Sequence, residues 1–392
     1  MNPRTARHPP SSHYDVLIVG GGPAACALAL ALRHHRPAYR ILVIEKTAFR
    51  DWPLRIGENL PPATAVVLRQ LALWKDFIRL PFLSSRGTQC SWGSSDLSSH
   101  DYLFQALGSG WQIDRKLFDQ WLIRRAMRES VEYLAPYRLQ KIEEPFSAHG
   151  DRAWRVSIAK RPDEHRAEIH ARFLVDATGR AASLAKMLGA QRQAHDRLMA
   201  FYGYCTPAPV YDGAARVEAS PQGWWYSGPL PDGKLVVAFM TDRDQAHALR
   251  LNQASAWIKH LQSSIWTKAR VASFAKDFKP HSSAAHSQSL NPCCGPGWLA
   301  VGDAAGTYDP LSSLGLFKAL RNGLLAAYAT GDLLDDETQI ESAHSHHPAL
   351  IKYQGVMRAE FREYLSKRKL YYSMEQRFRE HPFWQRRQSP NQ

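Results

Sequence analysis

The stretch YDVLIVGGGPAACALALALRHHRPAYRILVIEK, residues 14–46, decides the fold of this chain. Its first six residues form a short apolar strand, and three glycines then lead into a helix rich in alanine and leucine. A second apolar strand begins at residue 41. Two strands joined by a helix form a βαβ unit, so we expect both strands to lie parallel in one sheet.

The glycine loop of this unit predicts a dinucleotide site. Gly20, Gly22 and Ala25 fit the pattern GxGxxG, with alanine in the last place. A side chain at Gly20 would obstruct the tight turn, and one at Gly22 would hold a pyrophosphate away from the backbone amides of the helix start. Glu45, followed by Lys46, ends the second strand, where a carboxylate can accept hydrogen bonds from a ribose diol. The unit alone does not separate FAD from NAD, and the alternative is a glycine turn in an ordinary α/β domain.

The composition narrows the class of protein. The chain has 392 residues, 44% hydrophobic and 22% charged, which is typical of a folded protein with more than one substructure. No apolar run reaches the roughly 18 residues that span a bilayer. Five scattered cysteines without a CxxC pair favour a reducing compartment. We therefore expect a cytoplasmic protein without a metal site, in which His344, His346 and His347 belong to a polar loop.

The formal net charge of +14 favours acidic partners or phosphorylated cofactors. The basic residues are dispersed and form no recognisable nucleic-acid module, so nucleic acid is not an expected partner. The densest basic stretch is RFREHPFWQRR, residues 377–387. It predicts either a solvated helix end or a docking surface for an acidic protein, and as a further alternative Phe383 and Trp384 anchor this tail to the body of the protein.

The rest of the chain suggests an interrupted domain. Residues 154–160 and 167–179 predict a strand hairpin, the segment between about 200 and 245 predicts a second sheet, and helices are expected from Leu314 onward. The predicted division is a disordered tail (1–13), a cofactor-binding domain (14–80, 105–190 and 291–335), an inserted β-sheet domain for the substrate (81–104 and 191–290) and a helical C-terminal region (336–392).

Three further segments carry a family resemblance. DATGR (176–180) and GDAAGTYDPLSSLG (302–315) each end a predicted strand, and WQIDRKLFDQWL (111–122) opens a helix. With the glycine loop they resemble the FAD-dependent monooxygenase superfamily typified by p-hydroxybenzoate hydroxylase, over nearly the whole chain. The resemblance implies an α/β fold in which a Rossmann-like FAD-binding domain carries an inserted β-sheet domain and a helical C-terminal region.

In this family the block that corresponds to residues 302–315 approaches the flavin. Asp303, which follows Gly302, would accept hydrogen bonds from ribityl or ribose hydroxyls of FAD. The helix opening after Pro310 would aim backbone N–H groups at the flavin, with Leu314 and Gly315 at its start, and would favour an anionic reduced flavin.

The resemblance also assigns five residues earlier in the chain. Gln112 and Arg115 would approach the FAD ribityl chain and phosphate. Asp176 would brace the loop beside FAD and any nicotinamide donor, and its alternative role is a turn cap at a strand end. Arg55 and Glu58, in RIGENLPPA, would line the site beside the isoalloxazine and are the only catalytic candidates.

Tryptophan halogenases share the GE and DPL blocks of this chain. Their chemistry needs a lysine soon after the GE segment and a glutamate in a DPLES run. Here Ser312 occupies the glutamate position, and residues 84–94 contain no lysine, with Arg86 as the nearest cation. Because a guanidinium cannot replace an ammonium in that chemistry, we expect a hydroxylase rather than a halogenase.

A narrower resemblance rests on SWGS, GWWYSGPLPDGKLVVAFMTD, DPLSSLG and the C-terminal tail. These segments resemble the flavoproteins that mature tryptophylquinone cofactors, the partners of quinohemoprotein amine dehydrogenase and of lysine and glycine oxidases. Trp224, Trp225 and Tyr226 would then form a substrate wall, or else pack on a sheet edge.

This resemblance implies an FAD monooxygenase that hydroxylates a tryptophan of an acidic partner protein or peptide through a flavin C4a-hydroperoxide. It would consume O₂ and electrons from NADH, NADPH or a separate supply of reduced flavin. One alternative is a small-molecule aromatic hydroxylase of natural-product biosynthesis. Another is a flavin-binding maturation chaperone without turnover.

Overall fold

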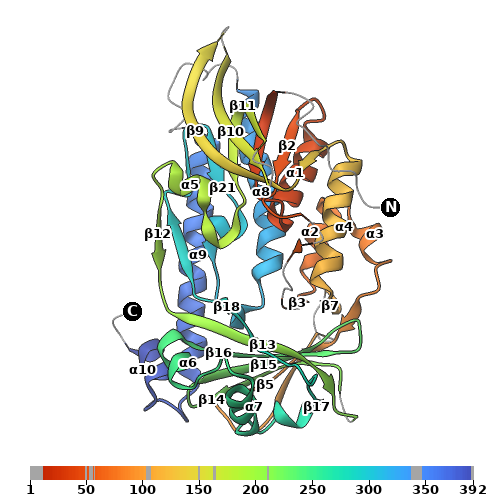
Figure 1. Ribbon diagram of the computed structural model, residues 1–392, viewed down its shortest axis with the longest axis vertical. Helices are drawn as coiled ribbons and strands as arrows, with labels where there is room; N and C mark the ends of the chain where they lie inside the picture. Colours follow the sequence, from red (N-terminus) through yellow and green to blue (C-terminus); the bar gives the residue numbers. More distant parts are fainter. Residues whose placement is uncertain are drawn as a thin grey trace.

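The chain folds into two sheet layers joined by long helices. The computed structural model describes residues 12–48, 51–52, 56, 58–102, 107–148, 151–161, 165–209, 212–336 and 347–389. The first sheet and its helices fill the upper half of Figure 1, and the second sheet crosses below them. Helix α9 (Pro348–Met374) runs along one side and connects the two layers.

The upper sheet is built around the predicted βαβ unit. β1 (His13–Val19) pairs in parallel with β2 (Ile41–Ile44), and α1 (Pro23–His35) crosses between them, which confirms the prediction. His13 already belongs to β1, while residues 1–11 of the predicted tail lie outside the described residues. The strand order is β20-β21-β11-β1-β2-β8, and the remaining bounds are β20 (Cys294–Gly295), β21 (Trp298–Ala300), β11 (Arg166–Asp176) and β8 (Glu132–Leu134).

A long antiparallel extension leaves this sheet at β11. β10 (Asp151–Lys160) pairs antiparallel with β11, as predicted for a hairpin, and β9 (Tyr137–Ala148) pairs with β10. The two outer strands rise from the top of the molecule in Figure 1.

Helices cover the upper sheet. α8 (Gly315–Asp335) approaches α1 so closely that a Cβ at Gly323 would lie 2.6 Å from the carbonyl oxygen of Ala24. α4 (Arg115–Arg128) begins at Asp114, whose carboxylate accepts a hydrogen bond from the backbone N–H of Leu117. Three short helices complete this half: α2 (Thr64–Gln70), α3 (Trp74–Phe77) and α5 (Ser183–Met187).

The lower sheet combines strands from two distant parts of the chain. Its order is β17-β13-β16-β15-β14-β5-β6, with β18 also paired to β13. β5 and β6 come from the segment before α4, and the others come from the segment after β12. The bounds are β5 (Gly87–Ser91), β6 (Ser98–Asp101), β13 (Leu198–Pro207), β14 (Ala215–Ser220), β15 (Gly223–Pro229), β16 (Leu235–Asp242), β17 (Val271–Ser273) and β18 (His281–Ala284).

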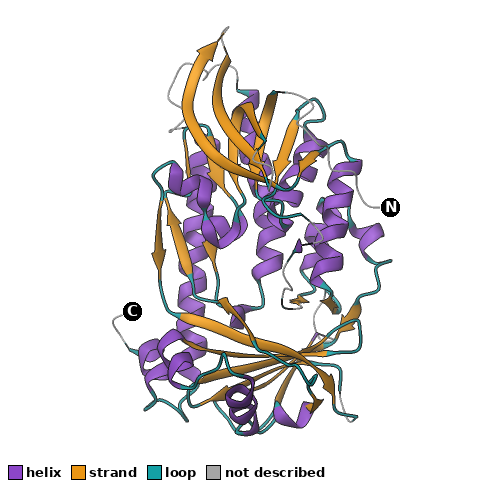
Figure 2. Cartoon of the chain, in the orientation of Figure 1, coloured by secondary structure: helices purple, strands orange, loops and turns teal. Residues whose placement is uncertain are grey.

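Two small sheets join the layers, and short helices flank the lower sheet (Figure 2). One small sheet has the order β3-β7-β4 and the other β12-β19-β22. Their bounds are β3 (Glu58–Leu60), β4 (Leu83–Ser85), β7 (Gly110–Ile113), β12 (Gln191–Ala194), β19 (Gln288–Asn291) and β22 (Gly306–Thr307). The helices are α6 (Arg243–Ala248) and α7 (Ala254–Gln262).

The basic tail is anchored to the lower sheet through α10 (Pro382–Gln388). Trp384 is fully buried and donates its indole N–H to the carbonyl oxygen of Ser220 at 2.9 Å. The buried Arg387 donates to Asp242 at 2.7 Å, and Arg386 binds the same carboxylate at 2.9 Å. The anchoring alternative therefore describes α10, and the charges of these two arginines are paired with the buried carboxylate of Asp242.

No helix within the described ranges has both the length and the apolarity to cross a bilayer. Among the same residues, no group of three or more histidine, cysteine, aspartate or glutamate side chains is arranged to hold a metal ion. His344 and His346 lie outside the described residues. His347 caps α9, where its Nδ1 accepts a hydrogen bond from the backbone N–H of Ala349.

Candidate functional site

The glycine loop between β1 and α1 has the shape that a pyrophosphate requires. Gly20 has a φ of 102°, and a Cβ there would lie 2.3 Å from the carbonyl oxygen of Ala177, so the turn needs glycine. A Cβ at Gly22 would meet nothing within 4 Å, which leaves the N-terminus of α1 open. Ala25 is fully buried one turn into α1. The loop therefore fits the dinucleotide that its sequence predicts.

Glu45 closes the edge of this loop. Its carboxylate accepts hydrogen bonds from the backbone N–H of Gly21 at 2.9 Å and of Thr47 at 3.0 Å. The neighbouring Lys46 is exposed. A carboxylate held beside the glycine loop is in position for the ribose contact predicted from the sequence, which stays a prediction.

Gln112 supplies a free donor near the centre of the molecule. Its side chain is 1% exposed, and its Nε2 has no hydrogen-bond partner among the described residues. A buried amide without a partner is costly, so this atom fits the ribityl contact implied by the resemblance. Arg115 binds Asp119 at 3.3 Å and lines a separate cavity of about 510 Å³ with residues of β13.

Asp176 is committed to the chain itself. Its buried carboxylate accepts hydrogen bonds from the backbone N–H and hydroxyl of Thr178 at 2.8 and 2.6 Å, and from the backbone N–H of Ala185 at 2.8 Å. This geometry matches the predicted bracing of the loop as well as the alternative role, a cap at a strand end. Asp176 thus fixes the loop after β11 rather than presenting a free carboxylate to a ligand.

Asp303 faces a lysine that the sequence reasoning overlooked. The Nζ of Lys318 lies 3.1 Å from Asp303 Oδ1 and also donates to the carbonyl oxygen of Gly306. The Lys318 side chain is buried, whereas that of Asp303 is 42% exposed. Burial opposes ionisation of Asp303, but Lys318 and two nearby arginines outweigh it and hold the pKa of the carboxyl below its ordinary value. Asp303 is therefore an ionised, reachable hydrogen-bond acceptor.

The start of α8 is open to a ligand. Pro310 belongs to a short 3₁₀ turn, Ser313 has a φ of 50°, and α8 begins only at Gly315, after Leu314. A Cβ at Gly315 would meet nothing within 4 Å. The backbone donors of this helix end therefore face open space, as expected beside an anionic flavin.

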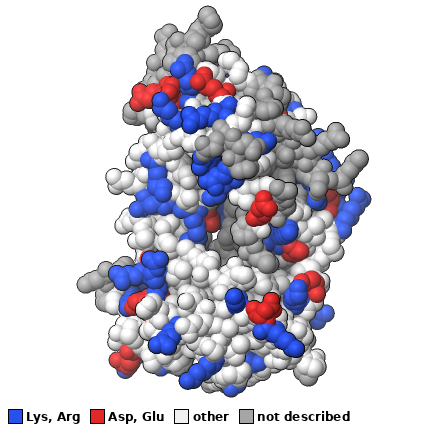
Figure 3. All heavy atoms as spheres, in the orientation of Figure 1, with Lys and Arg blue, Asp and Glu red and all other residues white. Residues whose placement is uncertain are grey.

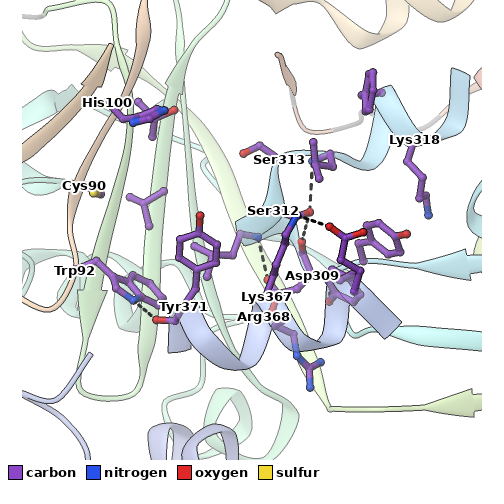
Figure 4. Close-up of a pocket in the computed structure, with 18 of the residues that line it drawn as sticks. Cys90, Trp92, His100, Asp309, Ser312, Ser313, Lys318, Lys367, Arg368 and Tyr371 are labelled. Carbon is purple, nitrogen blue, oxygen red and sulfur yellow. Dashed lines mark hydrogen bonds and ion pairs between the residues drawn. The ribbon is translucent and has the colours of Figure 1, made fainter. Parts of the chain in front are cut away.

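A cavity of about 840 Å³ begins at this helix end (Figure 4). Its strand side includes Cys90, Trp92 and His100, and its other side is formed by the start of α8 and by α9. From α9 come Glu360, Glu363, Tyr364, Lys367, Arg368, Tyr371 and Met374, which share one face of the helix. Figure 3 shows a hollow in the surface between the two layers, on a face where lysine and arginine predominate.

The predicted substrate wall does not line this cavity. Trp224 and Trp225 are fully buried and point to opposite faces of β15, as alternate strand residues do. Tyr226 is half-buried and is also absent from the cavity lining. The packing alternative describes these residues, and Trp92 forms the aromatic surface toward the cavity instead.

A buried hydrogen-bond chain supports the cavity from behind. Trp224 donates its indole N–H to the hydroxyl of Tyr372 at 3.0 Å, and Tyr372 donates to Asp309 Oδ2 at 2.8 Å. Burial and the nearby Asp196 raise the pKa of Asp309 to about 6. Asp309, which lines the cavity, therefore changes its charge near neutral pH.

The side chains of the two catalytic candidates lie outside the described residues. Arg55 lies outside the described residues, and Glu58 begins β3, although its side chain is also outside them. Sequence reasoning missed Lys318 and the α9 face. The spacing of Glu360, Glu363 and Lys367 at three and four residues is a signal that could have indicated a common helix face, but not what it lines.

The sequence model of one protein family, described as FAD binding domain, matches residues 13–323. The chain belongs to this FAD-binding domain family. The predicted α/β fold and FAD as its cofactor class are thus supported by a match that extends from β1 into α8. Gly22, Gly315, Gln112 and Asp303 are the residues whose geometry suits FAD.

Named relatives of this FAD-binding domain protein include LodB of Marinomonas mediterranea, which is named as an FAD-dependent oxidoreductase. The two sequences are 31% identical over 377 residues, covering 95% of this chain and 96% of LodB. The chain is therefore a protein of the FAD-dependent oxidoreductase type over the 377 residues that match.

Two solved structures share the fold. The myxobacterial chondrochloren halogenase CndH has a TM-score of 0.82 and 24% identity, covering 97% of this chain and 87% of CndH. The peptidyl tryptophan dihydroxylase QhpG, described as essential for tryptophylquinone cofactor biogenesis, has a TM-score of 0.68 and 22% identity, covering 97% and 79%. At these identities the likeness establishes the predicted architecture and not the reaction.

Proposed function

We propose that this FAD-dependent protein is a monooxygenase that hydroxylates a tryptophan side chain of a partner protein or peptide during tryptophylquinone biogenesis. The observation that carries the proposal is the mouth of the large cavity. Tyr371 and Met374 line the cavity and are 54% and 52% exposed. A wall that continues onto the surface suits a residue held in a polypeptide, whereas a free small molecule is usually enclosed.

The relatives support parts of this proposal. LodB matches nearly the whole chain, and QhpG, a peptidyl tryptophan dihydroxylase, shares the fold. The sequence segments that resemble tryptophylquinone-maturing flavoproteins include SWGS, which places Trp92 at the cavity. These observations favour an indole substrate over other aromatic rings.

The chain's own residues would bind and orient the indole. Trp92 and Tyr371 offer aromatic faces, and Trp92 is fixed by its hydrogen bond to the carbonyl oxygen of Tyr371 at 2.7 Å. Phe317, in the first turn of α8, adds apolar surface where the flavin is expected. Reduced FAD supplies the oxygen chemistry from O₂, with electrons from NADH, NADPH or a separate source of reduced flavin.

Halogenation is the competing reaction, because CndH is a halogenase. The cavity does contain lysines, Lys318 and Lys367, although they come from α8 and α9 rather than from residues 84–94. Lys318 is bound to Asp303, and Lys367 lies 2.6 Å from Glu363. Ser312 lines the cavity where halogenases of the resembling group have glutamate. We therefore propose hydroxylation and not halogenation.

The test is mass spectrometry of a short capped peptide with one tryptophan, incubated with the FAD-loaded protein, a flavin reductant, O₂ and bromide. We expect the mass of one or two oxygen atoms to be added, and none to a matched phenylalanine peptide. Bromine on the indole would refute the proposal in favour of halogenation. Oxidation of free tryptophan or free indole, without oxidation of the peptide, would favour the small-molecule hydroxylase. Binding of the peptide without turnover would favour the chaperone.

A further inference from the structure

The end of α9 carries an unusual exposed apolar surface. Leu370, Tyr371 and Met374 are 56%, 54% and 52% exposed and lie within two turns of one another. With Lys367 they occupy positions i, i+3, i+4 and i+7, so the four side chains share one helix face. We call these four residues the α9 stripe. Single exposed apolar residues are ordinary, but a contiguous group marks an interaction site.

The α9 stripe is continuous with the cavity. Lys367, Tyr371 and Met374 line both the cavity and the outer helix surface, while Leu370 lies only on the outside. In Figure 4, Lys367 and Tyr371 flank the side of the cavity opposite His100. A polypeptide whose side chain entered the cavity here would lay its neighbouring residues across the stripe.

The surroundings of the stripe are basic. Lys367 belongs to the stripe and is exposed, and its pair with Glu363 at 2.6 Å joins two exposed side chains, so the pair is weak enough to exchange for a partner carboxylate. The whole chain has a net charge of +14. Arg386 and Arg387, which the sequence suggested as a docking charge, are bound to Asp242 instead. The charge that can attract an acidic partner is therefore on α9 rather than α10.

We propose that the α9 stripe binds the partner segment next to the target tryptophan, and that this segment carries an apolar side chain flanked by carboxylates. Leu370 and Met374 would cover the apolar residue, because Met adapts its shape to a partner. Lys367 would face a carboxylate. The proposal rests on the proposed function, since it names the polypeptide chemistry that the same cavity would accept.

The helix offers a matched control for the apolar contact. Ile351 lies near the other end of α9, is also 56% exposed and does not line the cavity. Leu370→Gln and Ile351→Gln each remove exposed apolar surface and keep a good helix former. For the charges, Lys367→Gln is paired with Lys352→Gln, because Lys352 is an exposed lysine of the same helix outside the stripe.

The probes are two short capped peptides with one central tryptophan, one flanked by leucine and glutamate and the other by serine and lysine, together with N-acetyltryptophanamide. Binding is measured by fluorescence anisotropy of labelled peptide with the FAD-loaded protein, and oxidation by mass spectrometry. We expect Leu370→Gln to weaken binding of the acidic peptide roughly three- to tenfold, as half of a leucine surface is lost, with no change in FAD content. Ile351→Gln should match the wild type.

Salt separates the charge contribution from the apolar one. Lys367→Gln should weaken binding of the acidic peptide at low salt, and the difference should vanish near 1 M salt, where the Debye length falls to about 3 Å. Lys352→Gln should have no effect at either salt concentration. Oxidation of N-acetyltryptophanamide should be the same in the Leu370, Ile351 and Lys352 variants, because none of these three residues lines the cavity.

The outcomes distinguish the two proposals. If Leu370→Gln and Ile351→Gln behave alike, or if the acidic peptide binds no better than the basic one, the stripe is not the docking surface, whatever the reaction. If the acidic peptide binds through Leu370 but no indole probe gains oxygen, the docking inference stands and the hydroxylase proposal fails.

Discussion

Replacing Asp303 tests the cofactor site most directly. Its pair with Lys318 allows the loss of an FAD contact to be separated from a loss of stability. Asp303→Ala removes the predicted hydroxyl acceptor for FAD, but it also leaves the ammonium of Lys318 buried with only the carbonyl of Gly306 and the ring of Tyr308, 4.4 Å away. Loss of FAD in this variant could therefore come from a lost contact or from a destabilised fold. The two effects need separate measurements.

The structure gives a magnitude for each effect. Breaking a fully buried ion pair costs about 3–5 kcal/mol. Because Asp303 is 42% exposed, water compensates part of this loss, and we expect Asp303→Ala to lower the free energy of unfolding of the apoprotein by about 1–3 kcal/mol. A charge-assisted hydrogen bond to a ligand contributes about 1.5–3 kcal/mol, so FAD affinity should fall roughly ten- to hundredfold.

The double variant Asp303→Ala/Lys318→Met separates these effects. Methionine removes the buried charge and keeps the length of the side chain, so the free energy of unfolding should return to within about 1 kcal/mol of the wild type. FAD affinity should remain low, because the acceptor is still missing. Denaturant unfolding of the apoprotein and flavin fluorescence titration measure the two quantities, with Lys318→Met alone as the control. If the double variant binds FAD like the wild type, Asp303 is not the hydroxyl acceptor.

Three further results are expected. Trp384→Ala should lower the free energy of unfolding by about 3–5 kcal/mol in denaturant titration, because it empties a fully buried site and leaves the carbonyl of Ser220 without its donor; a change below about 1 kcal/mol would contradict the anchoring of α10. The raised pKa of Asp309 means that the folded state binds a proton more readily than the unfolded state, so this group costs stability above pH 6 and the cost disappears as the pH falls toward 4. The free energy of unfolding of Asp309→Asn should therefore exceed that of the wild type by about 2 kcal/mol at pH 8, and this excess should be lost at about pH 4.5. A difference that does not change with pH would refute the raised pKa of Asp309. Heat-denatured protein should release FAD rather than FMN on chromatography, since the open face at Gly22 suits a pyrophosphate, and FMN alone would contradict the dinucleotide site.

Local sequence determined the cofactor half of this protein. The βαβ unit of residues 14–46 is specified by short-range signals, namely an apolar strand, a glycine turn and a helix in immediate succession. The positive φ of Gly20 is required by the turn itself, although Gly20 also leaves room for the carbonyl oxygen of Ala177, which is a tertiary contact. The hairpin of β10 and β11 and the helices after Leu314 are likewise local features, and the structure confirms them.

The partners of single side chains were decided by tertiary contacts. Trp224 and Trp225 are neighbouring tryptophans that the sequence does not distinguish. In β15 they point to opposite faces of the lower sheet, so that Trp224 packs against Trp92 and Trp225 is buried on the other face. Arg386 and Arg387 appear as surface charge until Asp242, more than 140 residues away, is brought beside them. No local pattern predicts such pairs, because they depend on which strands and helices pack together.

The cavity itself is the clearest product of the tertiary structure. Its walls come from β5 and β6, from the loop before α8 and from α9, segments separated by more than 200 residues along the chain. The sequence predicts a helical region at residues 336–392 but not which helix face meets a cavity, because that depends on how α9 is rotated against the two layers. Local sequence therefore determined that this chain has a dinucleotide site, and the long-range packing of α8, α9 and the lower sheet formed the cavity beside it.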